Sequence, residues 1–252
     1  MSTDNKLTLA AIAVLAMCVA TTAHEAIGHG AACLLSGGQI TKLTSVYFDC
    51  SAHNVWVPAG GPLGNLGAAL AGLILLRLTP LGRPGWRLLF AAIFTMSLFW
   101  FAGYLLYSAV TGGGDNAIVA RILFGAPDWR WQVGLFLAGL VFYHFGINAV
   151  DYAFRPFAES RERSRGTVLT TYFAAALSAI LAASLYAPDR QASAIQGALE
   201  IGAATLPLLP MAFRMKLRTG PYETGIAANP FWIAAAAILF TAFAWTLGRG
   251  LP

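Results

Sequence analysis

Three ionisable side chains stand close together in the segment Ala23–Gly30, which reads AHEAIGHG. His24 and His29 offer imidazole nitrogens, and Glu25 offers a carboxylate. Zinc takes imidazole and carboxylate ligands, and a glutamate beside the ion can act as a general base. We therefore expect His24 and His29 to bind a metal ion and Glu25 to be a catalytic base. The plain alternative is that both histidines are ordinary hydrogen-bonded packing residues.

The spacing of the two histidines is HExxxH, one residue longer than the usual metalloprotease pattern HExxH. A regular α-helix turns about 100° per residue, so side chains five apart point about 140° away from each other. A π-bulge would absorb the extra residue, and Gly28 is a plausible place for it. Alternatively, Glu25 and His29, which are four apart, are the ligands and His24 supports them.

A second group of residues, Gly60–Asn65 (GGPLGN), opens the next apolar stretch. Pro62 suits the first turn of a helix, where its missing N–H costs nothing. Asn65 needs a partner inside a membrane, and its amide can donate to a substrate backbone or to an oxyanion.

A third group, Thr111–Asn116 (TGGGDN), is a flexible turn before a short apolar helix. Asp115 is a candidate third metal ligand, and its alternative role is to cap that helix. Asp151 is the rival third ligand. His53 and His144 are further possible metal neighbours, although each is more often an ordinary packed or exposed histidine.

The elements that carry these residues are apolar enough to cross a membrane. The chain has 252 residues, of which 58% are hydrophobic and 11% charged, and its mean hydropathy is +0.65. A hydrocarbon core of about 30 Å needs roughly 20 helical residues. We expect seven crossings, of which the sixth is interrupted by Glu200, Pro207 and Pro210. The expected spans are residues 7–36, 61–79, 88–110, 131–152, 167–187, 193–213 and 229–248.

This order of spans brings the three groups to one side of the membrane, because they lie at the end of span one, the start of span two and the end of span three. Residues 37–57 between the first two spans predict a small β-rich interfacial segment. The expected fold is an all-α polytopic membrane protein with one membrane domain, 1–252. Residues 1–124 would form its metalloprotease core, and residues 125–252 its additional transmembrane helices.

The cationic residues are unevenly distributed between the two sides. Eleven lie on the side of the N-terminus and five on the other, which places the N-terminus in the cytoplasm and the three groups outside. The eleven are Lys6, Arg77, Arg83, Arg87, Arg155, Arg161, Arg163, Arg165, Arg214, Lys216 and Arg218.

A cleaved signal peptide ending at Ala23 is the alternative for the first span. The net charge of +5 does not indicate nucleic acid, since no basic stretch alternates with aromatic residues. Three cysteines, Cys18, Cys33 and Cys50, form neither a CxxC pair nor an even disulfide framework.

These residues resemble the site-2 proteases, a family of intramembrane zinc metalloproteases. The likeness covers roughly the first half of the chain, and it lies in HEAIGHG, the β-rich segment, the box GPLGN and the stretch DNAIVARIL that Asp115 begins. The resemblance implies that His24, His29 and Asp115 bind zinc and that Glu25 activates water. It also implies that Gly61, Pro62 and Asn65 hold the substrate. Aligning Gly28-His29 on the family's Gly-His instead puts Glu25 in a ligand position, which would suggest an inactive relative.

The expected function is hydrolysis of peptide bonds in or near transmembrane segments of membrane proteins. The partners are then a membrane-protein or peptide substrate and the lipid bilayer, in the plasma or inner membrane. The alternative is a catalytically inactive relative that acts as a membrane scaffold or a transporter-like component. Too few histidines are present for a di-iron oxygenase, and no serine-protease motif is found. Family resemblance implies a site facing the cytoplasm, whereas the charge count places it outside.

Overall fold

The computed structural model describes residues 4–125, 128–215, 217 and 225–251. It contains seven helical segments that are long and apolar enough to cross a membrane. The expectation of an all-α polytopic membrane protein is therefore confirmed. The seven spans are Lys6–Leu35, Trp56–Leu78, Pro84–Thr111, Trp129–Phe157, Arg161–Ala183, Ala187–Arg214 and Pro230–Gly248.

Several spans are composed of more than one helical element. The elements are α1 (Lys6–Thr22), η1 (Ala23–Gly30), α2 (Ala31–Leu35), β1 (Ile40–Leu43), β2 (Phe48–Cys50), α3 (Trp56–Leu78), α4 (Pro84–Thr111), α5 (Asp115–Phe124), α6 (Trp129–Phe154), η2 (Arg155–Phe157), α7 (Arg161–Ala183), η3 (Ala187–Asp189), α8 (Arg190–Gly197), η4 (Ala198–Ala203), α9 (Leu208–Arg214), α10 (Pro230–Phe243) and η5 (Ala244–Gly248). The sixth span is interrupted, as expected, because it consists of η3, α8, the π-helix η4 and α9.

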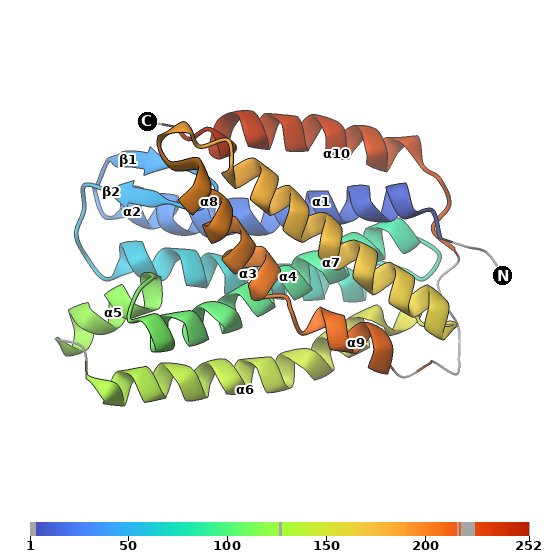
Figure 1. Cartoon of the computed structure of the whole chain (residues 1–252), viewed down its shortest axis with the longest axis horizontal. Coiled ribbons are helices and arrows are strands. Elements are labelled where there is room, and N and C mark those ends of the chain that lie inside the picture. Colours follow the sequence, from blue (N-terminus) through green and yellow to red (C-terminus); the bar gives the residue numbers. More distant parts are fainter. Residues whose placement is uncertain (1–3, 126–127, 216, 218–224, 252) are drawn as a thin grey trace.

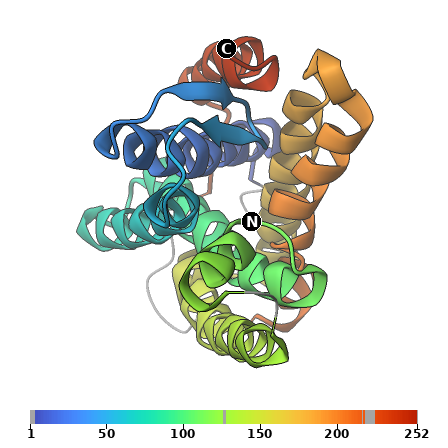
Figure 2. The ribbon, with the colours of Figure 1, turned by 90° about the vertical axis from the view of Figure 1, so that its left-hand side faces the viewer.

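Helix α1 lies in the middle of the bundle and contacts α4, α7 and α10 (Figures 1 and 2). Most of its side chains are buried, including Leu9, Ile12 and Met17. Helix α6 packs mainly on α4 and lies at the edge of the bundle, where most of its side chains are exposed. The first span thus lies at the centre of the bundle, so its residues contact other helices on several sides.

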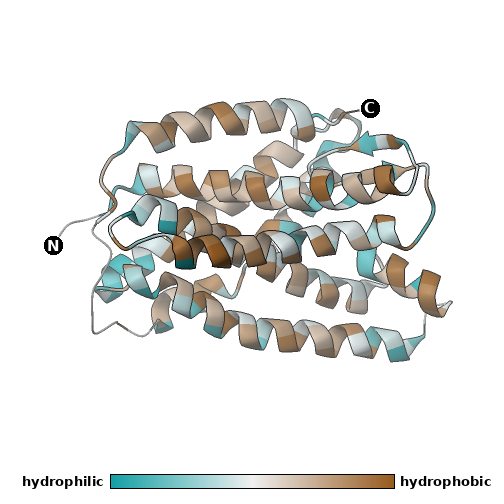
Figure 3. Ribbon diagram, turned by 180° about the vertical axis from the view of Figure 1, so that it is seen from behind, coloured by the Kyte–Doolittle hydropathy of each residue, from teal (hydrophilic) through white to brown (hydrophobic). Residues whose placement is uncertain are grey.

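The two ends of the bundle differ in structure. At one end lie the hairpin of β1 and β2, helix α5 and the C-terminus, and the N-terminus lies at the other (Figure 1). Hydrophilic residues gather toward both ends, while brown apolar residues occupy the middle of the helices (Figure 3). The antiparallel hairpin confirms the expected β-rich segment, and Leu43 also bridges to Leu251.

A disulfide between Cys33 and Cys50 fastens β2 to α2, with 6.0 Å between the two Cα atoms. The sequence reading found no disulfide framework, because two cysteines 17 positions apart form no recognisable motif. That reading was wrong for this pair, which the fold brings together. Cys18 is free and buried in α1.

The second span begins earlier than expected. Helix α3 starts at Trp56, so Pro62 lies inside the helix rather than in its first turn. Pro58, three positions into α3, occupies the favourable place instead. The difference arises because the connection after β2 is short and ends near Asn54, whose side chain accepts hydrogen bonds from the backbone N–H groups of Trp56 and Val57.

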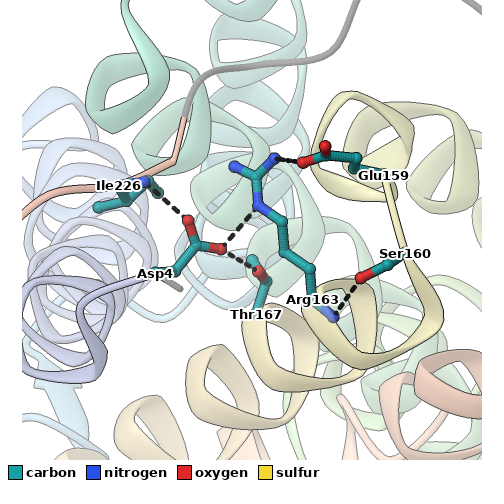
Figure 4. A network of polar contacts seen from close by, with 6 residues as sticks. All are labelled: Asp4, Glu159, Ser160, Arg163, Thr167 and Ile226. Carbon is teal, nitrogen blue, oxygen red and sulfur yellow. Dashed lines mark hydrogen bonds and ion pairs between the residues drawn. The ribbon is translucent and has the colours of Figure 1, made fainter. Parts of the chain in front are cut away.

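Asp4 and Arg163 form a buried ion pair at the opposite end (Figure 4). Nε of Arg163 lies 3.0 Å from Oδ2 of Asp4, and both side chains are 6% exposed. Asp4 also accepts hydrogen bonds from the Thr167 hydroxyl and the Ile226 backbone N–H. These contacts join the start of α1 to α7 and to the segment before α10.

Lys216 and Arg218, which belong to the charge count, lie outside the described residues.

Candidate metal centre

A π-helix, η1, carries both histidines of the HExxxH pattern. In a π-helix the N–H of residue i+5 bonds to the carbonyl of residue i, so residues five apart lie on one face. His24 and His29 are five apart and both are buried. The expected π-bulge is thus confirmed. The structure brings His24, not Glu25, into the cluster with His29.

His24, His29 and Asp115 place one ligand atom each within 4.8 Å of the others. Nε2 of His24 and Nε2 of His29 each lie 3.2 Å from Oδ2 of Asp115. Tetrahedral zinc with bonds of about 2.0–2.1 Å separates its ligand atoms by about 3.3 Å. The two distances to Asp115 therefore match the spacing of ligands around a zinc ion.

The tautomer of His29 is set by a backbone carbonyl. Nδ1 of His29 lies 2.7 Å from the carbonyl oxygen of Val57, which can only accept. Nδ1 therefore carries a proton, which leaves Nε2, the nitrogen that faces Asp115, to bind a metal ion. A metal-binding histidine usually donates its other N–H to such a partner.

Asn65 is the partner of His24. Its side-chain nitrogen lies 2.9 Å from Nδ1 of His24, and its Oδ1 is buried with no hydrogen-bond partner. Turning the amide over would let Oδ1 accept from Nδ1–H, which frees Nε2 for a metal. Asn65 is fully buried at this position, and its expected contact with substrate stays a prediction.

Glycines let η1 and α3 approach each other closely. A Cβ atom on Gly28 would overlap the Gly60 backbone, and one on Gly64 would overlap the Ala23 carbonyl oxygen. Gly60 and Gly64 form the small-xxx-small spacing typical of close helix pairs in membranes. A Cβ atom on Gly61 would overlap Nε2 of both His24 and His29. The box GPLGN thus leaves open the space beside the two ligand nitrogens.

Glu25 is buried beside the cluster, with 2% of its side chain exposed. Its Oε2 atom has no hydrogen-bond partner. A buried carboxylate oxygen without a hydrogen-bond partner is costly, so a water molecule bound at Oε2 would supply the missing hydrogen bond.

Asp115 is the first residue of α5, and Gly114 is the N-cap, so the alternative capping role is wrong. Burial raises the pKa of the Asp115 carboxyl, but hydrogen bonds with His24 and His29 outweigh that effect and hold the pKa below its usual range. The carboxylate is thus anionic, as a metal ligand must be.

Two aromatic rings cover the histidines. Trp100 of α4 stacks on His24 with ring centroids 4.4 Å apart, and Phe48 of β2 stacks on His29 at 5.2 Å. Sequence reasoning did not find either ring, because an aromatic residue in an apolar helix or a short strand carries no signal of its own. Phe48 makes the hairpin part of the wall of the site.

The rival ligands lie elsewhere. Asp151 of α6 pairs with Arg155, the first residue of η2, at 2.8 Å. His53 and His144 are exposed, and neither belongs to a metal-binding group among the described residues. Pro62 is buried in α3 next to Gly61.

No protein-family model matches the chain, and no curated protein or solved structure shows a significant match.

Proposed function

We propose that the chain is a zinc metalloprotease that hydrolyses peptide bonds in or near membrane-spanning segments. The observation that carries the proposal is the convergence of His24, His29 and Asp115 beside Glu25 inside a membrane bundle. Zinc in this position would supply a water molecule of lowered pKa and polarise a carbonyl oxygen.

Each residue of the site has a separate task. Nε2 of His24 and of His29 and Oδ2 of Asp115 would hold the ion, while Val57 and Asn65 orient the rings. Glu25 accepts a proton from the attacking water and passes it to the leaving amine. A buried carboxylate suits this task because its unpartnered oxygen is available to a water molecule.

The substrate segment must be extended where it is cut, because a helical carbonyl is occupied by its own hydrogen bond. Among the described residues β2 pairs only with β1, which leaves its other edge open. An extended peptide can add to such an edge. Phe48 of β2 stacks on His29, so a peptide on this edge would pass close to the metal centre.

Metal analysis of the purified protein in detergent tests the proposal. The wild type should hold about one zinc ion per chain, and the substitutions His24→Ala, His29→Ala and Asp115→Ala should each remove it. His144→Ala, on an exposed histidine of α6, is the matched control and should keep the metal.

Cleavage of a membrane-protein substrate then tests the chemistry. Glu25→Gln should keep zinc and lose cleavage. Equal cleavage by wild type and Glu25→Gln would contradict the role of Glu25. A wild type that binds zinc but cleaves none of a broad panel of membrane proteins and casein would instead be the inactive relative.

A further inference from the structure

A cavity of about 220 Å³ lies between α4, α6 and the α8–η4 segment. Four aromatic residues line it, together with two polar ones from the sixth span. The aromatic residues are Trp100, Tyr104, Tyr107 and Tyr143, and the polar ones are Gln196 and Glu200. Its volume suits one long side chain rather than a whole cofactor.

The cavity shares a wall with the metal centre. Trp100 lines the cavity and also stacks on His24 at 4.4 Å. Tyr104 lines it as well and meets the His24 ring edge-on at 5.8 Å. A group bound in the cavity is therefore separated from the metal ligands by a single layer of rings.

Glu200 is a buried acid without a cationic partner among the described residues. It is 4% exposed, lies in the π-helix η4, and accepts one hydrogen bond, of 2.9 Å, from the side chain of Gln196. π-Helical segments are frequent at functional sites. A buried carboxylate that nothing else requires is a candidate for ligand binding.

The charges around the cavity favour a cation. Glu25, Asp115 and Glu200 interact with one another electrostatically, and all three are acids. Glu200 is the one of the three that lines the cavity. Bringing a cation to Glu200 would offset the cost of its burial.

The aromatic walls favour the same ligand. Ring faces attract ammonium and guanidinium groups, most strongly when the groups are desolvated. The hydroxyl of Tyr143 donates to the carbonyl oxygen of Ala204, so this residue offers the cavity its ring more than its hydroxyl. Aromatic rings together with one carboxylate are groups that attract a cation.

We propose that this cavity is a specificity subsite for a lysine or arginine side chain of the substrate, next to the bond that is cleaved. The inference rests on the proposed protease function of the metal centre. Substrate segments often carry such residues near a membrane surface, where long cationic side chains bury their stems and seek a polar partner for their heads.

Peptide binding tests the subsite without any need for cleavage. Two fluorescein-labelled apolar peptides, identical except for a central lysine or norleucine, are titrated by anisotropy into zinc-loaded Glu25→Gln protein in detergent. The lysine peptide should bind about tenfold more tightly, the size of a desolvated cation–aromatic contact.

Two variants in the same background locate the effect. Glu200→Gln keeps the shape of the side chain and should remove the preference for lysine. Glu162→Gln, on an exposed acid of α7, should leave the preference unchanged. Tyr107→Leu removes one aromatic wall and should reduce the preference in protein that elutes as wild type on size exclusion.

Equal binding of the two peptides, or a preference that survives Glu200→Gln, overturns the subsite even if zinc and cleavage are found. Absence of zinc from the wild-type protein would instead overturn the proposal that the three residues bind zinc. The two peptides are then compared on metal-free protein, where the same Glu200-dependent preference would support the cavity as a cation site.

Discussion

At the scale of single residues, Gly61 is important for the candidate metal centre because it has no side chain. The ring nitrogens of His24 and His29 occupy the place where its Cβ would stand. Gly61→Ala should therefore displace a histidine and abolish zinc binding, measured by metal analysis of the purified protein. Gly67→Ala is the control on the same helix, because a Cβ there meets nothing within 4 Å. Equal loss in both variants would indicate a general effect of alanine in α3 rather than a filled site.

A substitution at Asn65 tests whether the orientation of the His24 ring affects zinc affinity. Its only described side-chain contact is with Nδ1 of His24. Removal of such a partner typically lowers metal affinity about 10–100-fold. Asn65→Ala should show this loss in a competition titration with a zinc chelator. Asn148→Ala should not, since Asn148 is exposed and bonds only to the backbone of its own helix. Unchanged affinity in Asn65→Ala would indicate that packing against Trp100 and Tyr104 is enough to orient His24.

The sequence predicted that His24, His29 and Asp115 would lie together, because ionisable residues are costly in an apolar membrane bundle without a function. It could not predict the groups that contact and orient the two histidine rings. The Val57 carbonyl has no side-chain signal, and Phe48 and Trp100 are ordinary apolar residues until the fold brings them to the rings. Glu200 was visible only as an interruption of the sixth span, since its nearness to Glu25 depends on the packing of α8 and η4 against α4 and α7.

At the scale of elements, the π-helix explains how an extra residue is accommodated. Histidines five apart in a π-helix share a face, as histidines four apart do in an α-helix. Ile27 lies between them and is 63% exposed, so its side chain contributes little to packing inside the protein. The extra residue is thus local to η1, and the helix on either side can keep its own contacts.

Deletion of Ile27 should consequently convert η1 to α-helix, restore HExxH and leave zinc bound. Deletion of Ala13, in the regular part of α1, should instead rotate one side of the buried helix by about 100° against the other and prevent folding. Metal content and size-exclusion behaviour of the two variants are the measurements. Loss of zinc in well-folded protein without Ile27 would show that the π-helix itself is required.

The hairpin could be placed from the sequence, but its attachment could not. Apolar residues scattered among polar ones between the first two spans predicted a small β-rich interfacial segment. The disulfide from Cys50 to Cys33 and the bridge from Leu43 to Leu251 join positions that are distant in sequence, and only the completed fold brings them together. The C-terminus is therefore held at the same end of the bundle as the metal centre.

At the scale of the whole molecule, two independent features indicate which end faces the cytoplasm. The charge count puts eleven cationic residues on the side of the N-terminus and five on the side of the metal centre. The Cys33–Cys50 disulfide lies at the metal end, and disulfides persist in oxidising compartments. Both favour an orientation with the candidate metal centre outside the cytoplasm, whereas the resemblance to site-2 proteases implies the opposite.

Reporter fusions in a bacterial host decide between these orientations. Leu251 pairs with Leu43 of the hairpin, so a reporter at the C-terminus reports the side of the metal centre. Alkaline phosphatase fused there should be active, because it needs an oxidising compartment, and green fluorescent protein fused there should stay dark. A chain ending at Arg214, after the sixth span, should reverse both signals because the reporter then lies at the opposite end. Fluorescence from the full-length fusion together with an inactive phosphatase would place the metal centre in the cytoplasm, where the Cys33–Cys50 pair would be reduced.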